Sequence, residues 1–126
     1  MPALNRVQLI GYLGRDPEAR YTAKGTKYAT FSIAVDRRWK SIEGEKHEMT
    51  DWFTINAWSK LADISLEYLK KGRLVFIEGR LQTDRWEDAK GEAHYRTIVV
   101  ARTIQLLDRR PEEPEDTETP VEELAE

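Results

Sequence analysis

Apolar and polar residues alternate with a period of two along several short stretches of the chain, and residues 74–81 form a more continuous apolar run, broken by residues 78–80; both patterns are typical of strands. The stretches are residues 7–12, 28–35, 52–58, 74–81 and 98–106. Turn signals separate them: Asp16-Pro17, Lys24-Gly25, Glu43-Gly44 and Lys90-Gly91. The pattern predicts five β-strands over residues 1–107.

One stretch between the third and fourth predicted strands has helical spacing instead. Leu61, Ile64 and Tyr68 recur at helical intervals. We expect Ser59 to cap the N-terminus and Gly72 to end the helix, after two lysines in its last turn. Three strands, a helix and two strands is the order of an OB-fold, a five-stranded Greek-key barrel. The predicted fold is therefore all-β, and Gly11 and Gly79 are expected to allow its sharp coiling.

The strand pattern stops after Leu107. Prolines at positions 111, 114 and 120 alternate with acidic residues, and no aromatic residue appears. Such a segment buries too little apolar surface to offset the entropy lost on ordering. We therefore expect one OB-fold domain over residues 1–107 and a disordered acidic tail over residues 108–126.

Charge is distributed unevenly between these two parts. The chain of 126 residues has a formal net charge of -3, of which residues 108–126 carry -7 and residues 1–107 carry +4. A basic body with an acidic tail suits a core that binds a polyanion, although +4 is ordinary for a domain of this size. There is no cysteine, no membrane-spanning apolar run and no leader pattern. We expect a cytoplasmic, nucleoid-associated protein.

The four tryptophans are the first candidate functional residues: Trp39, Trp52, Trp58 and Trp86. Alternation places Trp52 and Trp58 on one face of the third strand, with Thr54 and Asn56 between them. The opposite, purely apolar face is expected to fill the barrel. Large aromatic side chains on the outside imply a partner. The alternative is that the tryptophans belong to the core or to a subunit interface.

Basic residues near the tryptophans are the second set of candidates. Unpaired bases stack on any aromatic face, and their phosphates need cations nearby, so this combination is typical of single-strand binding. Each cation alone is most simply a solvated surface charge, and only the whole constellation points to DNA. The candidates are Arg37, Arg38, Lys40, Lys60, Lys71, Arg73, Arg80 and Arg85.

Several motifs resemble the bacterial single-stranded DNA-binding protein family. They are the opening stretch 5–18, residues 31–39, Asp51-Trp52, residues 58–62, residues 67–72, residues 77–79 and Arg85-Trp86. The resemblance covers about residues 4–107 in order. It implies a homotetramer of OB-folds that pair through their first strands, with DNA wrapped outside. It also implies that the four tryptophans stack on bases, that Lys60 and Lys71 lie near DNA, and that the protein protects single strands in replication, recombination and repair.

Two features depart from the family pattern. Asp84 lies where the strand before Trp86 is often richer in cations, which weakens the expected phosphate contact. The chain also ends Val121-Glu122-Glu123-Leu124-Ala125-Glu126, whereas family tails usually end in an aspartate cluster followed by Pro-Phe. Recruitment of replication and repair proteins through the tail is therefore doubtful.

Three other functions are alternatives to the binding of single-stranded DNA. His47 begins a sequence like that of zinc proteases, but Asp51 replaces the second histidine and the segment is a hairpin, so we expect no catalytic residue, no metal and no cofactor. A module that binds protein or sugar remains open, because the OB-fold serves many ligands. A duplex-DNA binder is disfavoured because no basic recognition helix is visible.

Overall fold

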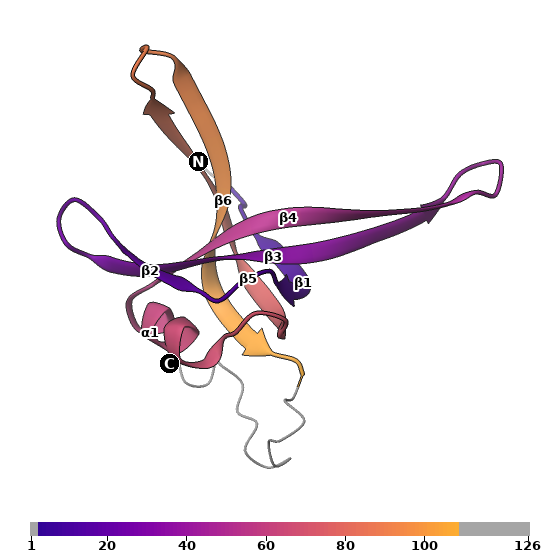
Figure 1. The fold of residues 1–126 in the computed structure, drawn as a ribbon, viewed down its shortest axis with the longest axis horizontal. Coiled ribbons are helices and arrows are strands. Elements are labelled where there is room, and N and C mark those ends of the chain that lie inside the picture. Colours follow the sequence, from indigo (N-terminus) through magenta and orange to yellow (C-terminus); the bar gives the residue numbers. More distant parts are fainter. Residues whose placement is uncertain (1–2, 109–126) are drawn as a thin grey trace.

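The computed structural model describes residues 3–108 as six strands and one helix (Figure 1). The strands are β1 (Val7–Leu13), β2 (Glu18–Tyr21), β3 (Lys27–Lys40), β4 (Lys46–Trp58), β5 (Leu74–Glu87) and β6 (Ala93–Leu106). The helix is α1 (Ser59–Tyr68), between β4 and β5. Residues 109–126 of the predicted tail fall outside the described residues, so its disorder and the domain boundary remain predictions. Within residues 3–108 no helix has the length and apolar character needed to cross a bilayer.

Five of the strands close into a barrel. The sheet order is β1-β5-β6-β4-β3-β2, and β1 also pairs with β3 at Tyr12↔Ala34 and Leu13↔Ile33. All pairings are antiparallel except β4 with β6, which run parallel at Ile55↔Val99 and Asn56↔Val100. This arrangement confirms the predicted OB-fold barrel with one helix.

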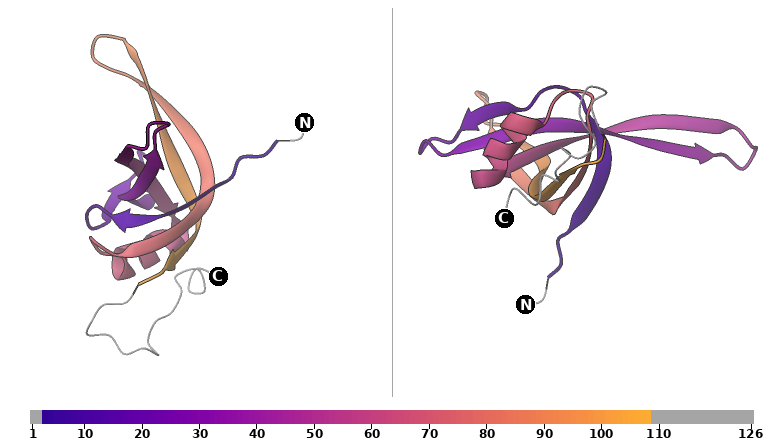
Figure 2. Two further views of the ribbon diagram at one scale, coloured as in Figure 1. Left: turned by 90° about the vertical axis from the view of Figure 1, so that its right-hand side faces the viewer. Right: turned by 90° about the horizontal axis from the view of Figure 1, so that it is seen from below.

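Two pairs of strands continue well beyond the barrel as hairpins. The β3–β4 ribbon and the β5–β6 ribbon project from it in different directions (Figures 1 and 2). Their tips are the predicted turns, where Gly44 and Gly91 adopt positive φ angles of 87° and 82°. The predicted strands were therefore too short at these ends, because a ribbon exposed on both faces has no apolar alternation to mark it.

Strand β2 was missed for a similar reason. All four of its residues are exposed, and it lies at the sheet edge, paired only with β3. An edge strand with no buried face shows no periodic pattern. Its existence depends on the complementary backbone of β3 rather than on its own side chains.

The barrel core consists mostly of aliphatic side chains from every barrel strand. Ile33, Ile55, Ile77 and Ile104 are fully buried at its centre. The helix α1 packs against β2, β3 and β4. It contributes Leu61, Ala62 and Ile64 to the same cluster, as its helical spacing indicated.

The predicted helix ends were wrong in detail. Ser59 is not the cap: Trp58 takes that position and makes no side-chain capping hydrogen bond. The helix ends at Tyr68, before the lysines, and the Leu69 N–H donates to the Ser65 carbonyl. Gly72 does adopt a positive φ, but its N–H donates to the Leu13 carbonyl and so ties the turn to β1.

A buried carboxylate links β1, β5 and β6 on the outer side of the barrel. Glu78 accepts hydrogen bonds from Arg6 at 2.6 Å, Gln8 at 3.1 Å and Arg102 at 2.7 Å, and its side chain is almost completely covered. The hydrogen bond from Arg6 is the main reason that the pKa of Glu78 lies below its ordinary value; burial acts in the opposite direction. The protein is therefore more stable when this carboxyl group is ionised.

Stability at low pH is expected to depend on Glu78. Because the folded protein binds this proton more weakly than the unfolded chain, the stabilisation is complete above the ordinary carboxyl pKa of about 4.3. It is lost as pH falls through the lowered pKa. Melting temperatures of the wild type and Glu78→Gln should therefore differ near neutral pH and converge in acid. A constant difference at all pH values would contradict this role.

Candidate functional site

One continuous face of the sheet carries most of the aromatic candidates. Asn56 pairs with Val100, which pairs in turn with Arg80, so their side chains share the outside of the barrel. Alternation then assigns further residues to this surface, here called the outer face: Trp52, Trp58, Trp86, Tyr28, Arg96 and Arg20. They come from β2, β3, β4, β5 and β6.

The three tryptophans of the outer face differ in how far their side chains are exposed. Trp52 is 61% exposed and Trp86 is 47% exposed, so neither belongs to the core of this chain. Trp58 is half-buried because it stacks on Tyr28, with ring centroids 4.5 Å apart. The prediction that Trp52 and Trp58 share the outer face therefore agrees with the register, but one side of the Trp58 ring is already covered.

Trp39 lies on the opposite face of the β3–β4 ribbon. Its register partner is His47, and it shares parity with Ile33 and Val35, whose side chains point to the barrel interior. The ribbon projects beyond the barrel, so Trp39 is nevertheless 44% exposed. Its ring stacks on His47 at 5.3 Å between centroids, and the Arg37 guanidinium lies 5.3 Å from its centroid.

Trp52 and Trp86 each lie close to one neighbouring residue. A Cβ atom on Gly14 would lie 2.5 Å from the Trp52 ring, so only glycine leaves room for the indole in this position. Trp86 stacks on His94, the residue directly opposite on β6, with 5.5 Å between ring centroids. A ring that is already stacked, as Trp86 is, loses little side-chain entropy when a flat ligand binds to it.

Three of the candidate arginines form ion pairs at the surface. Arg37 pairs with Asp51 at 2.6 Å, Arg38 with Glu48 at 2.8 Å, and Arg85 with Glu87 at 3.3 Å. Exposed pairs of this kind contribute only about 0–1 kcal/mol, so a phosphate can replace the carboxylate at low cost. The other exposed candidates are Lys40, Lys60, Lys71 and Arg80.

Arg73 is placed differently from the other candidates. It is only 7% exposed, and its Nε donates to Asp108 at 2.7 Å. The same carboxylate accepts the Leu74 N–H at 3.0 Å, so Arg73 and Asp108 join the start of β5 to the end of β6. We leave Arg73 out of the binding surface, because its described contacts are structural.

The structure adds residues that the sequence did not single out. A pocket of about 150 Å³ lies over Thr54 and Asn56 of β4, and its walls include Arg15, Arg20 and Arg96 together with Glu18. Arg20 was missed because β2 shows no strand pattern. Arg96 was missed because the first half of β6 is exposed on both sides and gives no alternation. With these residues, the outer face has stacking rings interleaved with cations, an arrangement that can bind bases and phosphates together.

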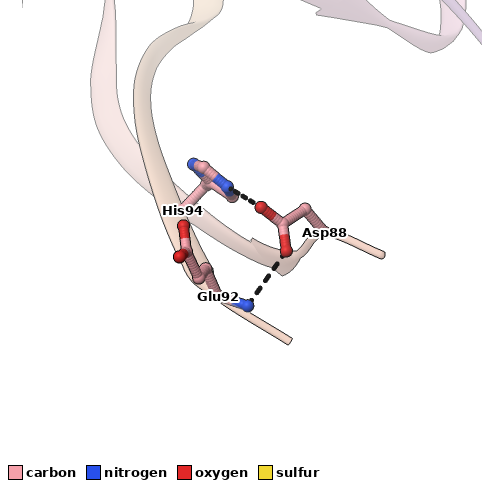
Figure 3. Close-up of side chains that lie close together, drawn as sticks. All are labelled: Asp88, Glu92 and His94. Carbon is pink, nitrogen blue, oxygen red and sulfur yellow. Dashed lines mark hydrogen bonds and ion pairs between the residues drawn. The ribbon is translucent and has the colours of Figure 1, made fainter. Parts of the chain in front are cut away.

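A group of possible metal ligands lies at the tip of the β5–β6 hairpin. The ligand atoms of Asp88, Glu92 and His94 lie within 4.8 Å of one another (Figure 3). Asp88 already accepts the N–H groups of Lys90 and Glu92 at 2.9 and 3.0 Å, and its other oxygen lies 2.8 Å from His94 Nε2. These bonds, led by the one to His94, hold the pKa of Asp88 below its ordinary value. The cluster is explained by its role in forming the turn.

Comparisons with known proteins agree with this geometry. The model of the single-strand binding protein family matches residues 4–107. Single-stranded DNA-binding protein 1 of Chlorobaculum tepidum is 50% identical over 105 residues, which span 82% of this chain but only 65% of that protein. The single-stranded DNA-binding protein of Thermotoga maritima is 41% identical over 130 residues, covering 99% of this chain and 92% of the relative.

A solved structure is also similar to this chain. The protein in the structure titled "Plasmodium falciparum SSB complex with ssDNA" superposes with a TM-score of 0.79 at 30% identity, over 86% of this chain and 98% of that one. The matched family comprises binding proteins, which confirms the expectation that this chain is not an enzyme. From its fold, its sequence and these relatives, the chain belongs to the single-strand binding protein family.

Proposed function

We propose that this protein binds single-stranded DNA with little overall sequence preference, by stacking bases on its tryptophans and placing phosphates near its arginines and lysines. The observation that carries the proposal is the outer face, where exposed Trp52 and Trp86 lie on one surface with Arg96 between their strands. The names of the relatives support the same ligand.

Each part of the surface has a separate physical role. Arginines and lysines release counterions when they approach the phosphates, which gives affinity without sequence information. Indole rings then offer flat faces to unpaired bases, worth roughly 1–3 kcal/mol per base. Paired bases in a duplex have no free faces, so the same rings discriminate against double strands. Trp39 extends the path onto the other side of the β3–β4 ribbon.

The proposal includes a homotetramer. Residues 7–11 of β1 pair with β5 on one side only, since the pairing with β3 is confined to Tyr12 and Leu13. Ile10 and Tyr12 are 53% and 51% exposed on this strand. An open strand edge with exposed apolar side chains can pair with a second copy of the chain. Such pairing would bury both the edge and the apolar side chains. Four barrels would give DNA an extended surface to wrap.

In this proposal the protein coats single strands during replication, recombination and repair, which would place it at the nucleoid. Coating blocks hairpin formation because stacked bases are not available for pairing. Recruitment of other proteins depends on the tail, which lies outside the described residues.

Fluorescence titration tests the proposal directly. Oligo(dT) should quench the tryptophan emission strongly, because bases stack on exposed indoles, whereas a duplex of equal length should not. The mass of the protein and of its complex, measured in parallel, tests the tetramer. Equal quenching by single and double strands would favour a duplex binder, and no response to either would favour a protein or sugar ligand.

A further inference from the structure

The outer face has a hollow between its two stacking positions on β4. Trp52 and Trp58 are six residues apart, and the residues between them on this face are small and polar: Thr54 and Asn56, with Ser32 and Thr30 opposite them on β3. Six residues of strand span about 20 Å. A DNA strand that stacks on both indoles must therefore pass over the hollow.

Asn56 lies at the floor of this hollow, and the hydrogen bonding of its side-chain oxygen is not satisfied within the described residues. It is only 6% exposed, although it belongs to the polar outer face, and its Oδ1 accepts no hydrogen bond from any residue of the described chain. A buried polar atom without a partner costs roughly 1–3 kcal/mol. The amide can rotate to present either its oxygen or its NH₂ group to the hollow, so Asn56 can complete its hydrogen bonding with a ligand.

Three arginines and the carboxylate of Glu18 line the hollow, so its walls carry more donors than acceptors. Arg15 and Arg20 both lie beside Glu18, at 4.0 and 3.1 Å, whereas Arg96 forms no ion pair within residues 3–108. A guanidinium has only donors, and an asparagine amide has both donors and an acceptor. This set is complementary to a ligand edge that carries mainly acceptors.

The volume of the hollow favours a base with a single ring. Its volume is about 150 Å³. A cavity of about this volume in another protein holds benzene, a single six-membered ring. Pyrimidine bases have one such ring and carry at least two acceptors, the O2 and N3 of cytosine or the O2 and O4 of thymine. Purines have two fused rings and need more space.

We propose that this hollow holds one unstacked pyrimidine base of the bound strand and that Asn56 is the residue that selects it. This inference rests on the proposed binding of single-stranded DNA. The indoles then supply binding without sequence preference, and the hollow adds a preference for pyrimidine-rich strands. The nearby arginines donate to the acceptors of the inserted base and to the phosphates that flank it.

The test compares Asn56→Leu with the wild type on oligo(dT) and oligo(dA) of equal length. Leucine keeps the branched shape of asparagine but offers no hydrogen bond. Bases in oligo(dA) also stack on one another, which weakens binding to any protein. The quantity to compare is therefore the ratio of the dissociation constants for oligo(dA) and oligo(dT), measured for each protein. The self-stacking of oligo(dA) is the same for both proteins, so it cancels when their ratios are compared. We expect Asn56→Leu to reduce the dT preference roughly three- to tenfold, the effect of one lost hydrogen bond, while affinity for oligo(dA) changes little.

Two controls keep the outcomes distinct. Thr83→Val makes a similar change on the other face of the β5–β6 hairpin and should leave the ratio unchanged. If Asn56→Leu does not fold, the side-chain NH₂ signals of the wild type serve instead: Asn5 and Asn56 are the only asparagines, and only Asn56 should shift more with oligo(dT) than with oligo(dA). An unchanged ratio, or equal shifts, would overturn the pyrimidine hollow alone. Failure of the wild type to bind either strand would instead overturn the proposed function.

Discussion

Replacing Gly79 with alanine is expected to lower the free energy of unfolding by roughly 3 kcal/mol, the upper part of the usual range for overpacking. A Cβ atom at this position would lie 2.0 Å from the Val100 carbonyl oxygen and 2.9 Å from its carbon. Both are backbone atoms of β6, so no side chain can move aside. Gly79 also lies at the register shift between β5 and β6, and such an irregularity bends the strand that contains it. Urea denaturation followed by circular dichroism measures the loss.

Gly14→Ala is the matched control for this prediction. Its added Cβ atom would meet the ring of Trp52, which is an exposed side chain and can shift. We expect less than half the destabilisation of Gly79→Ala, together with weaker DNA binding because the indole is displaced. A Gly79→Ala protein that unfolds at the same urea concentration as the wild type would show that β5 and β6 are farther apart than described.

Replacing Trp52 with alanine is expected to have the largest effect on DNA affinity among single changes. Loss of one stacking ring should weaken binding by roughly 1–3 kcal/mol, or about five- to 150-fold. Stability should change by no more than about 0.5 kcal/mol, because the side chain is 61% exposed. Fluorescence anisotropy of a labelled oligo(dT) measures the affinity, and thermal melting measures the stability.

Two further variants separate stacking from other effects of Trp52. Trp52→Phe keeps an aromatic face and should retain most of the affinity. Tyr95 is similarly exposed, at 66%, but pairs with Arg85 on the other face of the β5–β6 hairpin, so Tyr95→Ala should have a much smaller effect. Equal losses for Trp52→Ala and Tyr95→Ala would mean that the outer face is not the preferred path of the DNA.

Local pattern was enough to predict much of the candidate site. In the third predicted strand the side-chain period of two placed Ile55 inside and Trp52 outside, because one of its faces is purely apolar. The positions of the hairpin turns followed from single glycines in the same way. These features depend only on neighbours within a few residues, so a linear sequence contains the information.

The binding surface as a whole could not be predicted in this way. Tyr28 covers Trp58 because the register of β3 and β4 brings them opposite each other. Arg96 lines the same hollow as Asn56 because β4 and β6 run parallel for two residue pairs. In the sequence Arg73 resembles the other cations, and only the fold brings it to Asp108, 35 positions away.

The sequence by itself determined the number and order of the barrel strands, the helix, most of the turns and the outward direction of Trp52. Only the tertiary structure decided which side chains meet: the hollow around Asn56, the covered side of Trp58, the opposite face taken by Trp39 and the close approach of Gly79 to β6. The reason is physical. Side-chain direction repeats every two residues along one strand, whereas the contacts between strands depend on register, bulges and barrel closure, which involve segments far apart in the chain.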